Sequence, residues 1–182
     1  GSKPDYSEND LSMFKKYHIL QFNGTEQILE ELLDGKIVAI CRGRMEMGQR
    51  ALGNRSIISD PRNRHNIEKI NRMIKNRDFW MPFAPIILEE YQDELIINPK
   101  KISSPFMTIA FDTVEGDKNI PSAIHQYDKT CRPQILEKNV NPILWQLIKK
   151  FYERTKIPAL LNTSFNLHGE PIVRTVKDAL HV

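Results

Sequence analysis

Positive charge is concentrated in one short stretch of this chain, residues 42–55, which holds four arginines and a single acid, Glu46. Guanidinium groups so close together repel one another unless anions lie between them, and arginine is well shaped to bind phosphate or carboxylate through two parallel hydrogen bonds. Glycine recurs every five residues, which permits unusual backbone angles or a close approach to a ligand. A solvated basic loop is the plain alternative, but the regular glycines favour an anion site. The residues concerned are Arg42, Arg44, Arg50 and Arg55, with Gly43, Gly48 and Gly53.

Further polar side chains follow the predicted helices and strands, where the loops of such sheets usually carry chemistry. Lys75 and Arg77 come after a predicted helix, and two denser clusters lie further along the chain. Each cluster has a plain alternative: His125 and Asp128 could form a local hydrogen-bonded pair, and the second cluster could be ordinary turn chemistry. The clusters are His125, Asp128, Thr130 and Arg132, and Asn162, Thr163, Ser164 and Asn166.

The elements that position these residues follow from apolar periodicity and from turn signals. Helices and strands interleave, which predicts an α/β (or α+β) fold around one mixed sheet. Thr25 is the expected N-cap of the first helix, which ends at Gly35. Thr175 is the expected cap of a last helix that runs towards residue 182. We predict helices over 26–33, 66–75, 89–97 and 142–152, buried strands over 37–41 and 158–162, strands over 86–88, 106–111 and 124–128, a loop over 112–122, and a strand or loop over 133–136.

Composition sets the outer limits of the interpretation. The 182 residues are enough for one domain with a proper core, and a net charge of +3 is too mild to require nucleic acid. The two cysteines, Cys41 and Cys131, have no metal-ligand spacing, so we expect reduced thiols in a cytoplasmic protein. No apolar run approaches the ~20 residues that span a bilayer, and no signal peptide is recognisable.

The same motifs resemble those of the NodU/TobZ-type O-carbamoyltransferases, in family order, over about residues 30–182. The resemblance implies a YrdC-like domain over residues 25–182, a twisted mixed sheet flanked by helices, preceded by a tag scar and linker over residues 1–24. We expect the larger N-terminal metal-binding domain of those enzymes to be missing. The matching blocks are Gly43-Arg44-Met45-Glu46 with Gly48 and Arg50-Ala51-Leu52-Gly53-Asn54-Arg55-Ser56, Pro82-Phe83-Ala84-Pro85, Ser104-Pro105-Phe106-Met107, and Leu161-Asn162-Thr163-Ser164-Phe165-Asn166 with Gly169-Glu170-Pro171-Ile172.

What the resemblance implies is an activity that uses carbamoyl phosphate and ATP. Carbamoyl phosphate loses phosphate, and the carbamate attacks the α-phosphate of ATP to give carbamoyl-adenylate and pyrophosphate. The N-terminal domain then transfers the carbamoyl group to an acceptor hydroxyl. Such anionic substrates account for the arginines and usually bring Mg²⁺ with the nucleotide. We expect no metal site in this chain, since Fe or Mn belongs to the absent domain.

The resemblance also assigns expected roles to single residues. Lys75 and Arg132 are the expected catalytic residues, and His125 and Asp128 would support the site. Of the substrate-binding residues, we expect Asn162 and Ser164 to hydrogen-bond the planar carbamoyl amide. The full expected substrate- and nucleotide-binding set is Arg44, Arg50, Arg55, Arg77, Asn162, Ser164 and Asn166.

The chain also departs from the family pattern. An arginine commonly precedes the Pro-Phe-Ala-Pro block, but here that position is Met81, and Arg42 is the candidate to replace the lost cation. A second class of function stays open: a YrdC-like module that binds nucleotide or RNA through a basic face without turnover. Pyrophosphate release that depends on both substrates discriminates between the two.

Overall fold

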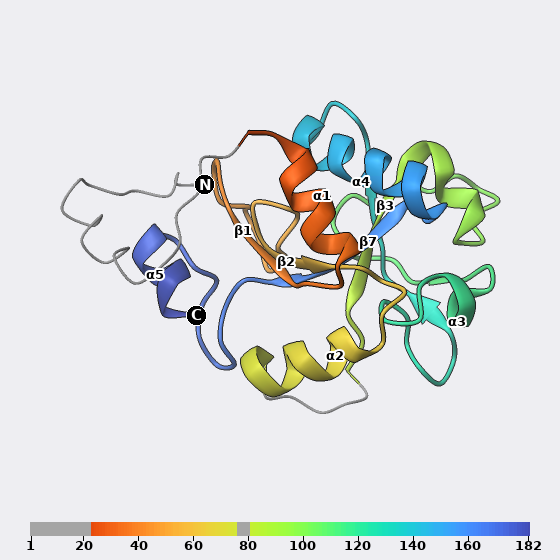
Figure 1. The fold of residues 1–182 in the computed structure, drawn as a ribbon. Coiled ribbons are helices and arrows are strands. Elements are labelled where there is room, and N and C mark those ends of the chain that lie inside the picture. The colour runs from red at the N-terminus through yellow and green to blue at the C-terminus, as the bar shows by residue number, and fades with distance from the viewer. Residues whose placement is uncertain (1–22, 76–80) are drawn as a thin grey trace.

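The computed structural model describes residues 23–75 and 81–182 and contains a five-stranded mixed sheet (Figure 1). The strand order is β1-β2-β7-β3-β6, in which only β3 and β6 are parallel. This arrangement confirms the predicted mixed sheet. The strands are β1 (Val38–Cys41), β2 (Arg55–Ser59), β3 (Ala84–Leu88), β6 (Gln134–Leu136) and β7 (Ala159–Ser164).

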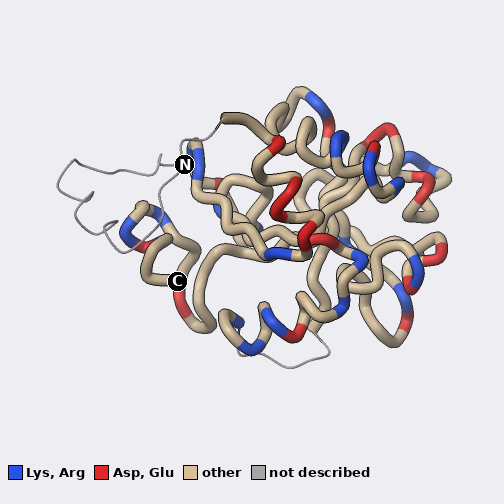
Figure 2. The backbone as a smooth tube through the Cα atoms, viewed as in Figure 1, with Lys and Arg blue, Asp and Glu red and all other residues tan. Residues whose placement is uncertain are grey.

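Two helices, α1 (Thr25–Leu33) and α4 (Pro142–Thr155), pack against each other and against the sheet (Figure 1). The apolar stripe of α4 is buried through Leu144, Leu147, Ile148 and Phe151. Helix α4 begins as predicted, because the Asn141 side chain accepts from the Leu144 amide and proline occupies the first turn. Acidic residues of α1 face basic residues of α4 (Figure 2), as in the Arg154–Glu30 ion pair at 3.1 Å.

The remaining elements surround the sheet. Helix α2 lies on the side opposite α1 and α4 (Figure 1) and continues as a π-helix, so the predicted helix over 66–75 is one continuous helical segment. The predicted helix over 89–97 is a shorter 3₁₀ helix. None of the helices in the described ranges is long and apolar enough to cross a membrane. These elements are α2 (His65–Ile70), η2 (Asn71–Lys75), η3 (Glu89–Glu94), β4 (Phe111–Asp112), α3 (Gly116–Asn119), β5 (Thr130–Cys131) and α5 (Val176–His181).

Several predictions about single elements were wrong. The strand expected over 106–111 is reduced to β4, because Met107 adopts a left-handed backbone (φ 57°) that breaks an extended run. Residues 124–128 contain a turn instead of a strand, and α3 interrupts the loop expected over 112–122. Strand β1 lies at the sheet edge and is only partly buried. The first helix is capped by Gly24 instead of Thr25.

Candidate functional site

The loop between β1 and β2, residues 42–54, is called the arginine loop below. Its backbone is organised by the one acid in the stretch: Glu46 Oε1 accepts from the amides of Leu52 (2.8 Å) and Asn54 (2.7 Å). Gly48 and Gly53 have φ of 113° and 110°, which confirms the unusual backbone angles predicted for them. A Cβ on Gly53 would also lie 2.4 Å from the Leu144 side chain. Glu46 was not among the expected site residues. That it is the single acid among four arginines could have indicated its role in the loop.

Arg55 lies inside the protein, behind this loop. Its side chain is fully buried, and its Nη1 donates to the carbonyls of Arg42 (2.6 Å) and Asn54 (3.0 Å). Its Nη2 lies 3.4 Å from both the Gly43 and the Arg174 carbonyl. A buried guanidinium that donates to several carbonyls fixes backbone instead of reaching a ligand. Arg55 therefore differs from Arg50 and Arg132, which are exposed and line cavities.

Three cavities share lining residues, and Arg132 lines all three. Two of them are also lined by residues of the arginine loop. The smallest, about 90 Å³, is lined by Arg50, Asn162 and Ser164 as well. A second, about 250 Å³, reaches His125 and Asp128, and a third, about 420 Å³, reaches Phe106 and Met107. We call the three together the arginine groove. Phe106, which is 60% exposed, and Met107 were expected in a strand, so their place in the groove was missed as well.

Arg50 and Arg132 supply exposed positive charge to this groove. Within the described part of the chain, neither guanidinium has a recorded hydrogen bond or ion pair. Arg50 comes from the arginine loop and Arg132 directly follows β5, so residues 82 positions apart in sequence line one small cavity. Two exposed guanidiniums next to one cavity form an arrangement that can bind a phosphate or carboxylate.

Asn162 provides a buried amide to the lining of the smallest cavity. It is 2% exposed, and its Nδ2 donates to the Ala51 carbonyl at 2.8 Å. Its Oδ1 is buried and accepts no hydrogen bond from any described residue. The register places Asn162 between Ile58 of β2 and Ala84 of β3, in the centre of the sheet. The sheet therefore holds this amide in a fixed position.

Lys75 connects the π-helix to the loop that follows β7. It is 4% exposed, and its Nζ donates to the Ser164 carbonyl (2.6 Å) and to Asn166 Oδ1 (2.7 Å). Ser164 Oγ in turn donates to Asn166 Oδ1 at 2.6 Å. The structure thus brings these three predicted site residues together, with Ser164 at the edge of the groove and the lysine behind it.

His125 and Asp128 lie at the far end of the groove. His125 Nδ1 is 2.9 Å from Asp128 Oδ1, so the local pair considered above is present. The amide and hydroxyl of Thr130 also donate to Asp128 Oδ1. The pKa of Asp128 is lowered, first by the Thr130 amide, then by its hydroxyl, with a smaller contribution from His125. The lowered pKa favours the ionised carboxylate, which lines the same cavity as Arg132.

The other predicted residues lie outside the groove or outside the described residues. Arg44 is exposed on the arginine loop and lines none of the three cavities. Arg77 lies outside the described residues. Arg42 Nη2 donates to Asn141 Oδ1 at 3.2 Å, and burial lowers the pKa of its guanidinium. Arg42 therefore contacts the start of α4 and lines none of the three cavities of the groove.

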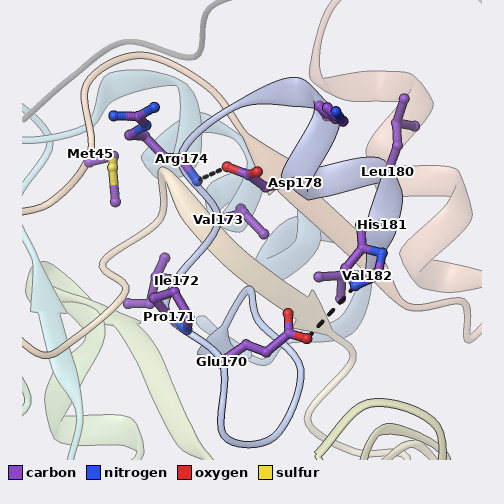
Figure 3. Close-up of a pocket in the computed structure, with 11 residues that line it drawn as sticks. Met45, Glu170, Pro171, Ile172, Val173, Arg174, Asp178, Leu180, His181 and Val182 are labelled. Carbon is purple, nitrogen blue, oxygen red and sulfur yellow. Dashed lines mark hydrogen bonds and ion pairs between the residues drawn. The ribbon is translucent and has the colours of Figure 1, made fainter. Parts of the chain in front are cut away.

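A larger cavity, about 950 Å³, lies between Met45 and the segment 170–182 (Figure 3). Two contacts join its lining residues: Asp178 accepts from the Arg174 amide at 3.0 Å, and Glu170 lies 3.7 Å from His181. None of the predicted catalytic or binding residues lines it. The candidate site is therefore the arginine groove, where the predicted polar residues converge, and not the largest of these cavities.

Charge and metal ligands complete the description of the site. Figure 2 shows lysine and arginine positions interspersed with acidic positions over the molecule, in keeping with the small net charge of +3. Across residues 23–75 and 81–182, no group of three or more His, Cys, Asp or Glu side chains could hold a metal ion.

The sequence of this chain resembles that of a known protein family. A family model described as the carbamoyltransferase C-terminus matches residues 29–182. Nodulation protein NolNO of Sinorhizobium fredii is 42% identical, over 83% of this chain and 22% of that protein. The 3'-hydroxymethylcephem-O-carbamoyltransferase of Amycolatopsis lactamdurans is 28% identical, over 84% of this chain and 28% of the enzyme. The chain therefore spans less than a third of either relative.

A solved structure shares the fold. Full-length HypF, in a phosphate- and nucleotide-bound form, matches with a TM-score of 0.61 and 17% sequence identity, over 90% of this chain and 20% of that one. At this identity the likeness concerns the fold alone. It confirms the YrdC-like mixed sheet flanked by helices that the resemblance implied.

Proposed function

Because this chain belongs to the carbamoyltransferase C-terminal family, we propose that it forms carbamoyl-adenylate from carbamoyl phosphate and ATP. In the first step, water cleaves carbamoyl phosphate to carbamate and inorganic phosphate. In the second step, a carbamate oxygen attacks the α-phosphorus of ATP, the bond from that phosphorus to the β-phosphate oxygen breaks, and pyrophosphate leaves. One water is consumed, and the products are carbamoyl-adenylate, pyrophosphate and phosphate.

The single observation that carries this proposal is the smallest cavity of the arginine groove. It combines two exposed guanidiniums, from Arg50 and Arg132, with the buried amide of Asn162. Phosphoryl transfer requires fixed positive charge where negative charge develops, and it requires that the reacting groups are held in place. The two guanidiniums and the Asn162 amide meet both requirements, because they come from different loops and strands of one sheet, which fixes their positions.

The proposed roles follow from where each side chain lies. Arg50 binds phosphate oxygens through its planar fork, and Arg132, which lines all three cavities, stabilises the carbamate or the α-phosphate. Lys75 holds Ser164 and Asn166 in position and brings positive charge close to the same end of β7. His125 and Asp128 support the site from the far cavity. Arg77 remains a proposed phosphate ligand.

Mg²⁺ would enter with the nucleotide and supply charge neutralisation at its phosphates. The described residues offer no cluster of three or more metal-ligating side chains, which fits an ion held mainly by phosphate oxygens and water. An Fe or Mn ion for acceptor chemistry would belong to a further domain. We propose that transfer to an acceptor hydroxyl, as the name of the cephem enzyme describes for that relative, also requires such a domain.

Pyrophosphate release tests the proposal. The chain is incubated with Mg²⁺ and ATP, with carbamoyl phosphate alone, and with all three together, and pyrophosphate and ADP are quantified. We expect pyrophosphate only when both substrates are present. ATP binding without pyrophosphate release in any mixture would support the alternative, a nucleotide-binding module without turnover.

A further inference from the structure

Gln134 is a polar residue in the apolar interior of the sheet. It is 2% exposed, and it begins β6, whose other residues, Ile135 and Leu136, are buried and apolar. Its Nε2 donates to the Leu52 carbonyl of the arginine loop at 3.2 Å. Its Oε1 is buried and accepts no hydrogen bond from any described residue. A buried carbonyl oxygen without a donor is costly, so the stability of the fold does not explain this glutamine.

A second buried amide reaches the same loop from the other side of β3. Gln134 pairs with Ile86 of β3, and Asn162 of β7 pairs with Ala84 of β3. Because Ile86 and Ala84 are two residues apart in one strand, both amide side chains lie on the same face of the sheet. Asn162 Nδ2 donates to the Ala51 carbonyl at 2.8 Å. The two amides therefore hold two consecutive carbonyls of the arginine loop.

Side chains also hold the backbone amides of this part of the loop. Glu46 Oε1 accepts from the Leu52 and Asn54 amides, and Ser56 Oγ accepts from the Gly53 amide at 2.9 Å. Both backbone polar groups of Leu52 thus have a side-chain partner. Its amide donates to Glu46, and its carbonyl accepts from the glutamine of β6.

Arg50 lies where this fixed part of the loop begins. Residues 51–54, called the clamped base below, have the side-chain partners just described. By contrast, no backbone–backbone hydrogen bond is recorded for residues 47–50 within the described part of the chain. Met47 is 92% exposed, and Gly48 has a left-handed φ of 113°. The position of the Arg50 guanidinium therefore depends on the clamped base that follows it.

We propose that Gln134 and Glu46 are positioning residues that hold the Arg50 guanidinium at the groove. Neither residue lines any of the three cavities, so each acts through the clamped base and not by contact with the ligand. A guanidinium that is already in place binds an anion without an ordering cost at the moment of binding. This inference rests on the proposed function, which supplies the phosphate ligand, and deepens it by naming what sets the strength of the Arg50 contact.

A double-mutant cycle tests the inference by calorimetric titration of the full 182-residue chain with inorganic pyrophosphate. Gln134→Leu should weaken binding about three- to tenfold, the effect of one hydrogen bond. Its thermal unfolding midpoint should stay the same or rise, because the unpaired Oε1 is removed. Arg50→Ala should weaken binding at least about tenfold, and the double variant should bind as Arg50→Ala does. A merely structural role of Gln134 would instead make the two losses multiply.

Glu46 offers a rescue by a conservative variant. Glu46→Gln keeps an oxygen that accepts from the Leu52 and Asn54 amides, so its affinity for pyrophosphate should stay within about twofold of the wild type. Glu46→Leu removes that oxygen and should weaken binding as Gln134→Leu does.

The matched control is Gln92→Leu in η3. Gln92 is another buried glutamine whose Nε2 donates to a backbone carbonyl, that of Glu89 at 3.0 Å, but it lines none of the three cavities. Its Oε1 accepts from Asn98 at 2.8 Å, so this variant should lower the unfolding midpoint and keep the wild-type affinity. The two glutamine variants therefore have opposite expected effects on stability and on binding.

Four results would overturn the inference: a wild type that binds no pyrophosphate, a Gln134→Leu that unfolds or binds as the wild type does, losses that multiply in the cycle, or a Glu46→Gln that binds no better than Glu46→Leu. Pyrophosphate release from ATP and carbamoyl phosphate separates it from the proposed function. Release together with multiplying losses rejects only the positioning role, whereas a coupled cycle without release rejects only adenylate formation.

Discussion

Arg50 and Arg55 are five residues apart in the sequence but differ in solvent exposure and in what their side chains contact. Arg50 is exposed at the groove, whereas Arg55 is fully buried and donates to backbone carbonyls. The sequence alone does not reveal this difference, because an arginine side chain can either bind a ligand or donate hydrogen bonds that stabilise the fold. Substitutions of these two residues should therefore affect different quantities.

Arg50→Lys should weaken ligand binding and leave the fold intact. Lysine keeps the charge but loses the planar fork that makes two parallel hydrogen bonds to phosphate. We expect the affinity for carbamoyl phosphate to fall about tenfold, as measured by calorimetry. The control is Arg154→Lys on α4, which pairs with Glu30 far from the groove and should bind as the wild type does. Equal affinities for all three proteins would show that Arg50 is not a phosphate ligand.

Arg55→Met should instead destabilise the protein. The substitution removes donors from the carbonyls of Arg42, Asn54 and Gly43 without leaving a large cavity. Buried carbonyls that lose a charged donor lower the free energy of unfolding by about 2–4 kcal/mol. Urea denaturation measures the change, with Arg44→Met in the same loop as an exposed control that should differ little. Equal stability of the two variants would refute a structural role for Arg55.

At the scale of elements, α5 depends on its cap more than on burial. No residue of α5 is fully buried, whereas α4 buries four. Its capping box is complete: Asp178 Oδ2 accepts from the Thr175 amide at 2.7 Å, and Thr175 Oγ1 accepts from the Asp178 amide at 3.1 Å. The pKa of Asp178 is lowered mainly by the Thr175 amide. Burial opposes this effect, and the Arg174 amide makes a smaller contribution in the same direction as Thr175.

The pH dependence of α5 follows from that lowered pKa. A carboxyl group with a depressed pKa in the folded state stabilises it above the unfolded value and loses this effect as pH falls through the folded pKa. The Thr175 amide chemical shift should therefore titrate with a midpoint below the ordinary value of 3.8. Asp178→Asn should abolish the titration, and the α4 amides should not follow it. A midpoint above 3.8 would contradict the capping box.

The sequence predicted elements well where a local signal was unambiguous. Helix α4 has an apolar stripe, an Asn141 cap and a proline in its first turn, and β7 begins with the buried apolar run Ala159-Leu160-Leu161. The segment 106–111 failed because partial alternation did not reveal the left-handed Met107. Contacts across the chain, such as Lys75 with Asn166 over 91 positions, depend on tertiary packing. The resemblance to a family predicted that these residues belong to one site, but it did not predict the hydrogen bonds between them.

At the scale of the whole molecule, lysines and arginines are distributed over many elements together with acidic residues (Figure 2), and Arg50 and Arg132 supply the exposed charge of the groove. Binding of an ATP analogue should therefore weaken as ionic strength rises, because exposed guanidiniums are screened by salt. Titrations at about 0.05 M and 0.5 M salt measure this, and circular dichroism at both concentrations verifies an unchanged fold. An affinity that is independent of salt would contradict an arginine-lined nucleotide site.

The central claim is that this chain joins carbamate to the α-phosphate of ATP. Exchange of radiolabelled pyrophosphate into ATP tests it most directly, because only a reversible step that releases pyrophosphate returns the label to ATP. We predict that label enters ATP when the chain, Mg²⁺, ATP and carbamoyl phosphate are together, and that omitting carbamoyl phosphate or substituting Arg132→Ala abolishes the exchange. Absence of exchange in the complete mixture, or equal exchange without carbamoyl phosphate, would contradict the claim.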